Sequence, residues 1–172
     1  TNGLQSSGAG TQTFRAGTSA GATSQGDYAV AIGSVAGATT QSSGAVAVGR
    51  AAGGTAQGVN AVAVGRGAGA NDQTTLATAV GNNAGQTSQG GSAVAVGINA
   101  GETTQSSNAV AVGNSAGKTT QGVGSVAVGY NAALTNQADN SVAAGRSAGQ
   151  DNQGATAVAI GYRAGEDTQG ES

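Results

Sequence analysis

The feature that most constrains the fold of this chain is a repeat of sixteen residues. Nine consecutive rows of sixteen residues fill residues 25–168 without an insertion or a deletion, and every row begins with Gln. These glutamines are Gln25, Gln41, Gln57, Gln73, Gln89, Gln105, Gln121, Gln137 and Gln153, and Gln169 opens an unfinished tenth row. A register kept this strictly indicates a solenoid, in which each repeat stacks on its neighbours.

The positions within a row, numbered here as columns one to sixteen from the Gln, differ in how strictly they are occupied. Columns five to nine read Ala-Val-Ala-Val-Gly with few changes, as in residues 61–65. Column nine is always Gly, column twelve is always Ala, and column thirteen is Gly except at Ala133. Columns three, four, ten, eleven and fourteen vary, so we expect them to face solvent, because packing against a neighbouring coil would restrict them.

This pattern predicts an all-β fold. The alternation over columns five to eight and the β-branched valines favour a strand, and the glycines of columns nine and thirteen favour bends. Sixteen residues are too few for the helical repeats, which need about 33 residues. We therefore predict a parallel β-roll whose coils stack at about 4.8 Å, with a strong strand at columns five to eight and a weaker one near column twelve.

The repeat also predicts the domain organisation. Residues 25–168 are expected to form nine β-roll repeats, and residues 169–172 to start a further one. Residues 1–24 are expected to be an atypical N-terminal coil or a junction, because Phe14 and Arg15 stand where the other rows have Val and Ala. The glutamines of column one are expected to form a ladder in which identical amides satisfy one another from coil to coil.

The composition limits what can fill the core. The chain has 33 Gly, only 2% aromatic residues, and no Pro, Cys, His, Met or Trp. Its bulky apolar residues are nearly all Val, and successive side chains of a strand point to opposite faces. We expect the larger valines inside the coil. The expected core residues are Val46, Val48, Val62, Val64, Val94, Val96, Val110 and Val112.

The alanines of columns five and seven would then form a flat outer wall. Soluble monomers rarely expose an apolar surface of that extent, so this wall is expected to be an oligomer seam. The expected seam residues are Ala45, Ala47, Ala61, Ala63, Ala93, Ala95, Ala109 and Ala111.

Several stretches resemble a known repeat. SNAVAVGNSA (residues 107–116), NSVAAGRSAG (140–149) and ATAVAIGYRAG (155–165) are similar to the NSVAIGxxA repeat of YadA-like head domains. Those heads belong to trimeric autotransporter adhesins, and similar repeats occur in phage and large-virus fibre proteins. The resemblance covers residues 25–168. It implies a left-handed roll, a homotrimer, and an extracellular location on a cell surface or virion.

The residue inventory argues against catalysis. Without His or Cys, most nucleophile–base pairs and zinc sites are excluded, and the acidic residues fall mostly in different columns. The formal charge is −2 and the six basic residues are scattered, which is unlike a nucleic-acid-binding surface. No apolar run is long enough to cross a bilayer. We expect no enzyme activity, no cofactor or metal site, no nucleic-acid partner and no membrane insertion in this segment.

The leading functional hypothesis is the structural and adhesive rod of a trimeric surface fibre. Arg and Tyr are frequent anchors in binding sites, so contact with a receptor, matrix or glycan is expected in column ten. The residues concerned are Arg50, Arg66, Tyr130, Arg146 and Tyr162.

Two alternative functions remain open. One is an ice-binding solenoid, because Thr recurs in column fifteen, although the residue two positions further on is Gln and not a second Thr. The threonines are Thr39, Thr55, Thr87, Thr103, Thr119 and Thr135. The other alternative is a purely architectural filament.

Overall fold

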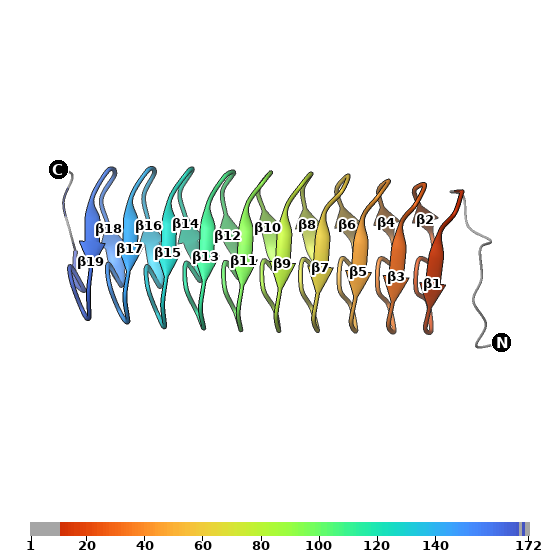
Figure 1. Ribbon diagram of the computed structural model, residues 1–172, viewed down its shortest axis with the longest axis horizontal. Coiled ribbons are helices and arrows are strands. Elements are labelled where there is room, and N and C mark those ends of the chain that lie inside the picture. The colour runs from red at the N-terminus through yellow and green to blue at the C-terminus, as the bar shows by residue number, and fades with distance from the viewer. Residues whose placement is uncertain (1–10, 169, 171–172) are drawn as a thin grey trace.

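The chain is an all-β parallel solenoid of stacked sixteen-residue coils, which confirms the fold expected from the repeat. The computed structural model describes residues 11–168 and residue 170, and these contain strands and turns but no helix. The coils stack along one long axis, with the first and last strands at opposite ends of the stack (Figure 1).

One of the two sheets is built from columns six to eight, and we call it the valine sheet. Within the described residues it has ten strands in the order of the chain, and each pairs in parallel with the strand one coil away. In every pair a residue lies beside the one sixteen positions later, as Ala95 beside Ala111. The strands are β1 (Phe14–Ala16), β3 (Val30–Ile32), β5 (Val46–Val48), β7 (Val62–Val64), β9 (Thr78–Val80), β11 (Val94–Val96), β13 (Val110–Val112), β15 (Val126–Val128), β17 (Val142–Ala144) and β19 (Val158–Ile160).

The other sheet, the glutamine sheet, has nine parallel strands in the part of the chain that the structure describes, and each ends on the Gln of column one. The strands are β2 (Ser24–Gln25), β4 (Thr40–Gln41), β6 (Ala56–Gln57), β8 (Asn71–Gln73), β10 (Thr87–Gln89), β12 (Thr104–Gln105), β14 (Thr120–Gln121), β16 (Thr135–Gln137) and β18 (Asp151–Gln153). The prediction of a second strand near column twelve is therefore wrong. Column twelve lies in a turn between glycines with positive φ, whereas the β-favouring threonines come just before the Gln.

The inside and outside of the valine sheet are the reverse of the prediction. The alanines expected on the seam, Ala45, Ala47, Ala61, Ala63, Ala93, Ala95, Ala109 and Ala111, are all 0% exposed and belong to the core. The valines expected in the core, Val46, Val48, Val62, Val64, Val94, Val96, Val110 and Val112, are only half-buried and lie on the outer face. The core is a column of small side chains, which are the alanines of columns five, seven and twelve with Ser125 and Ser141 in column five of two coils.

The glutamine side chains explain why the core holds alanine. Among the described residues they are the largest fully buried side chains, and they cross the narrow space between the two sheets. Gln105 Nε2 donates to the backbone oxygens of Val94 at 2.8 Å and Ala109 at 3.3 Å, and to Gln121 Oε1 at 3.0 Å. With an amide in each coil, the facing strand has room only for small side chains, Ala or, at Ser125 and Ser141, Ser, and the larger valines point outward.

The expected ladder of glutamines forms, in three blocks. Side-chain amides join Gln25 to Gln41, the five glutamines from 57 to 121, and Gln137 to Gln153. The first glutamine of each block has a side-chain oxygen without a hydrogen-bond partner among the described residues. These oxygens are Oε1 of Gln25, Gln57 and Gln137. Each amide nitrogen nevertheless bonds to backbone carbonyls, as Gln57 Nε2 does to Val46 O at 2.8 Å. The ladder therefore ties neighbouring coils together within each block.

Two columns of glycine allow the coils to stack closely and leave space for the buried glutamine side chains. In column nine, Gly113 has a φ of +130°, and a Cβ there would lie 2.5 Å from the backbone oxygen of Gly129 in the next coil. In column thirteen, Gly53 has a φ of +52°, and a Cβ would lie 2.6 Å from Gln57 Oε1. The first glycine lets successive coils stack, and the second makes room for the buried amide.

The N-terminal coil continues both sheets with different side chains. β1 pairs with β3 so that Phe14 lies beside Val30 and Arg15 beside Ala31. Arg15 thus occupies the column that holds the core alanine elsewhere, and its Nη1 donates to the Gly21 backbone oxygen at 2.9 Å. Of the expected atypical segment, residues 1–10 lie outside the described residues, as do residues 169 and 171–172 of the expected further repeat.

Candidate interaction surfaces

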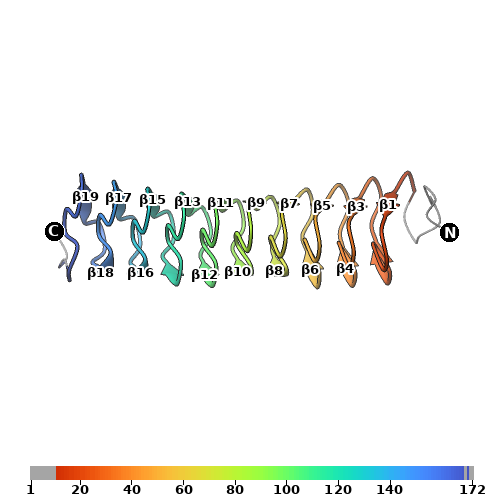
Figure 2. The same cartoon turned by 90° about the horizontal axis from the view of Figure 1, so that it is seen from below.

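The outer face of the valine sheet is a long apolar surface that runs along the described coils. Columns six and eight of the nine repeats hold only Val and Ile, apart from Thr78 and Ala144. Neighbouring coils cover part of each side chain, but Val80 is still 36% exposed and Val128 40%. The strands of this sheet form one continuous row along the stack in both views (Figures 1 and 2). An apolar surface of this kind usually marks a site of protein association.

The outer face of the glutamine sheet is polar and less regular. Its column sixteen holds Ser, Thr, Ala, Asp and Asn, and the residue there has a positive φ in four coils, at Asp72, Ser88, Asn136 and Asn152. An open hollow of about 430 Å³ lies beside the neighbouring strands β10 and β12. Its lining includes Asp72, Thr74, Ser88 and Thr104. The threonines of column fifteen are exposed or half-buried, but no second aligned column of threonines accompanies them.

Column ten brings three of the five predicted contact residues together. The guanidinium carbon of Arg146 lies 5.8 Å from the centroid of the Tyr130 ring and 5.6 Å from that of the Tyr162 ring. All three side chains are exposed, Tyr130 to 51% and Tyr162 to 67%. The three residues come from successive coils, so the sixteen-residue register places the cation between the two rings.

The other two predicted contact residues lie apart from this group. Arg50 and Arg66 occupy column ten of neighbouring coils nearer the N-terminal end, and both are exposed. Ser34 and Asn82 flank them in the same column, so they lack aromatic neighbours there. Polar residues and Ile98 separate the two groups along the column. The structure therefore divides the predicted contact residues into a Tyr–Arg–Tyr group and an Arg–Arg pair.

Arg163 adds a second cation beside Tyr162. Its guanidinium carbon lies 5.8 Å from the ring centroid, a contact that was not expected from the sequence. Unlike Arg146, Arg163 forms an ion pair, with 2.7 Å between its Nε and Glu166 Oε2. The hydrogen bond that Arg163 donates to Glu166, with the attraction between their charges, raises the pKa of Arg163 above its ordinary value.

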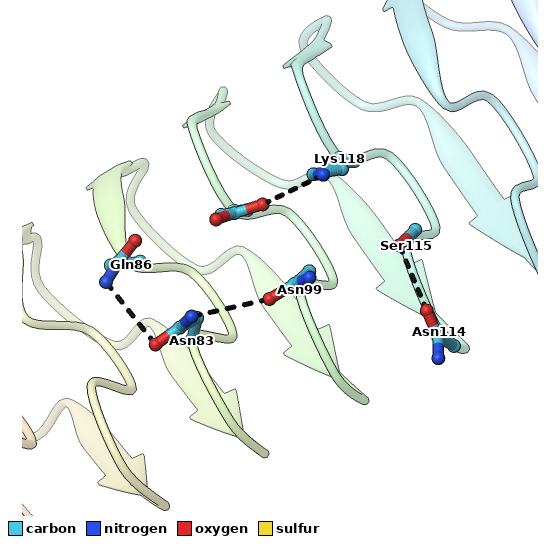
Figure 3. A network of polar contacts seen from close by, with 7 residues as sticks. Asn83, Gln86, Asn99, Asn114, Ser115 and Lys118 are labelled. Atoms are coloured by element: carbon cyan, nitrogen blue, oxygen red, sulfur yellow. Dashed lines mark hydrogen bonds and ion pairs between the residues drawn. The ribbon is translucent and has the colours of Figure 1, made fainter.

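Between these groups, side chains of columns eleven and fourteen bond to one another from coil to coil. Asn83 Nδ2 donates to Asn99 Oδ1 at 3.5 Å, and Lys118 Nζ lies 3.5 Å from Glu102 Oε2 (Figure 3). Gln86 Nε2 also donates to Asn83 Oδ1 at 3.4 Å. These polar groups are therefore engaged in contacts within the solenoid.

Among residues 11–168 and 170, no group of three or more acidic side chains is placed to hold a metal ion. In that part of the chain there is also no helix of the length and apolar character needed to cross a membrane.

No protein-family model, curated protein or solved structure matches this chain.

Proposed function

We propose that this chain is the rod of an extracellular surface fibre, in which three copies pack through the outer faces of their valine sheets. The observation that supports the proposal is the apolar outer face that runs over nine coils. The seam expected from the sequence is thus kept in the proposal, but it moves from the alanines to the valines of the same strands. The number three, a left-handed roll and a location on a cell surface or virion follow from the resemblance to YadA-like heads.

The regularity of the valine face favours a second copy of the same chain as its partner. The valines form rows that repeat with the spacing of neighbouring strands, about 4.8 Å. An identical chain presents rows with the same spacing, so ridges and grooves stay in register over the full length of the contact. A partner with another spacing would fall out of register within a few coils. Val is also small enough to let two sheets approach closely, which buries more of each half-buried side chain.

The coil-to-coil contacts suit the chain for a mechanical role. Both sheets run the length of the array, and buried amides reinforce the backbone bonds between neighbouring coils. A rod of this kind supplies length and stiffness, and its varied outer columns are available for contact with a host or another surface. This combination supports attachment over a purely architectural filament, which would need no exposed anchor residues.

The native molar mass tests the proposal. Light scattering on a sizing column should give a mass near three times 15.9 kDa. A charged residue on the seam, as in Val112→Glu, should shift the mass toward one chain. The matched control is Val123→Glu, because Val123 is 45% exposed but lies in column three, outside the valine sheet. A wild-type protein that is monomeric at micromolar concentration would refute the proposal, as would equal dissociation of the two variants.

A further inference from the structure

The Tyr–Arg–Tyr group in column ten has the chemistry of a binding site. Arg146 stands between Tyr130 and Tyr162 at 5.8 and 5.6 Å, within the range in which a cation is attracted to an aromatic ring. Two rings on either side restrict the positions that the guanidinium can take, although the group is exposed. The N–H donors of Arg146 are therefore held near one place before any ligand arrives, which lowers the entropic cost of binding.

The charge of Arg146 is not neutralised by the rest of the described chain. Within residues 11–168 and 170, the ion pairs join Lys118 to Glu102 and Arg163 to Glu166, and no carboxylate lies at ion-pair distance from Arg146. A planar guanidinium with free donors suits a carboxylate, which it can bind through two parallel hydrogen bonds. The local charge thus favours an anionic ligand.

The surrounding acidic residues limit how much negative charge the ligand can carry. Glu166 pairs with Arg163, and Asp167 is close enough to contribute to the raised pKa of Arg163. Asp151, in the same coil as Arg146, is half-buried. A polyanion such as a nucleic acid would meet these carboxylates, whereas a ligand with one acidic group would meet only the unpaired Arg146. The site therefore fits a single carboxylate.

The two tyrosines suggest what surrounds that carboxylate. With half or more of their surface exposed, Tyr130 and Tyr162 offer apolar ring surface and a hydroxyl group on both sides of the cation. A sugar ring has the matching character, with C–H groups on its faces and hydroxyls at its edge. We propose that Tyr130, Arg146 and Tyr162 form a binding site for a glycan residue that carries one carboxylate. This inference rests on the proposed attachment function, for which it names the class of receptor.

The test compares two probes that differ in one group. Methyl β-D-glucuronide and methyl β-D-glucoside share the sugar ring, but only the first has a carboxylate. Ligand-observed NMR titrations should show binding of the glucuronide, with affinity for the glucoside lower by roughly tenfold or more, the usual value of a charge-assisted hydrogen bond. Glucoside binding as tight as glucuronide binding would overturn the proposal, and so would the absence of binding to both.

Substitutions show whether glucuronide binds at this site or is attracted to positive charge in general. Arg146→Gln should abolish glucuronide binding, and Arg146→Lys should weaken it, because an ammonium group lacks the planar pair of donors. Tyr130→Ala combined with Tyr162→Ala should also weaken it, although Arg146 keeps its charge. The control is Arg50→Gln combined with Arg66→Gln, which removes two charges from the same column and should leave binding unchanged. Equal loss in the control would contradict the assignment.

The native mass of each variant distinguishes this proposal from the proposed function. A trimer that does not bind glucuronide would overturn the glycan site and leave the fibre intact. A monomer that binds glucuronide, with the expected response to Arg146→Gln, would support the site and refute the fibre.

Discussion

The two faces of a single strand differ in the size of the side chains they hold. In β13, Ala111 points into the coil and is 0% exposed, whereas Val110 and Val112 point outward and are half-buried. In most domains the larger apolar residues are inside. Here the order is reversed because buried glutamines already fill the space between two closely spaced sheets. The core of such a thin solenoid is specified by an amide ladder and methyl groups, and the larger apolar groups are left for the outer face.

The largest loss of stability is expected when a glutamine in the middle of the ladder is replaced. Gln105→Leu keeps much of the side-chain volume but removes the donors to Val94 O and Ala109 O and both links to neighbouring glutamines. Because buried polar groups then lose their partners, we expect a loss of about 3–5 kcal/mol in the free energy of unfolding. Denaturant unfolding at a fixed protein concentration measures it. Thr104→Val, an exposed change in the same strand, should stay within about 0.5 kcal/mol of wild type.

The next largest effect on stability should distinguish an inner coil from the last coil that the structure describes in full. Gly113→Ala would bring a methyl group 2.5 Å from the Gly129 oxygen, and we expect a cost of about 2–3 kcal/mol. Gly161→Ala makes the same change at a φ of +117°, where the described residues leave 4 Å of open space. It should cost about 1–2 kcal/mol, from the backbone conformation alone. Thermal unfolding of both variants would show the difference, and equal costs would mean that the coil-to-coil contact does not matter.

Changing the size of a side chain on either face of the valine sheet should have a smaller effect on stability or on association. Ala111→Val places two extra methyl groups in the filled interior and should destabilise the coil by about 1–3 kcal/mol. Val112→Ala removes the same groups from the outer face and should weaken association between copies instead. Unfolding and native mass, measured on both variants, separate the two outcomes. A well-tolerated Ala111→Val would show that the interior has more room than the structure indicates.

The smallest effect concerns a contact on an outer loop. The backbone N–H and the hydroxyl of Thr11 donate to Asp27 Oδ1 at 2.6 and 2.9 Å, and these bonds lower the pKa of Asp27 from 3.8. A lowered pKa in the folded state means that the bonds stabilise the N-terminal coil above pH 3.8 and are lost as the pH falls through the lower value. An NMR titration should show the Thr11 amide resonance shifting in that acidic range. A shift centred above pH 3.8 would contradict this contact.

The sequence predicted the solenoid, its register and the glutamine ladder because each depends on identical residues in identical places. It also placed Tyr130, Arg146 and Tyr162 in one column, which is why they meet. The prediction of which face of the valine sheet is buried was wrong. It relied on the larger size of valine, whereas the better guide is how strictly a column keeps one residue type. Column seven is always Ala, while the outer columns admit Thr78 and Ala144. That constancy was the available signal of burial.

Some features of the structure depend on three-dimensional geometry and could not be predicted from the residues in each column. The distance between the two sheets is set by how the glutamine amide reaches carbonyls on the facing strand, as in the bond from Gln57 to Val46 O. The contact of Arg163 with Tyr162 joins neighbouring columns, and the turn at column eleven directs the arginine there. Neither follows from residue spacing alone.

The central claim, that the valine face and not the alanine face joins the copies, is tested most directly by cross-linking. The chain has no cysteine, so Val112→Cys introduces a single thiol on the outer face of the valine sheet, and Val123→Cys introduces one on an exposed loop. Under mild oxidation at low protein concentration, we predict that the Val112→Cys protein forms disulfide-linked pairs within the oligomer and that the Val123→Cys protein does not. A Val112→Cys protein that stays uncross-linked, or cross-linking only at Val123→Cys, would contradict this account.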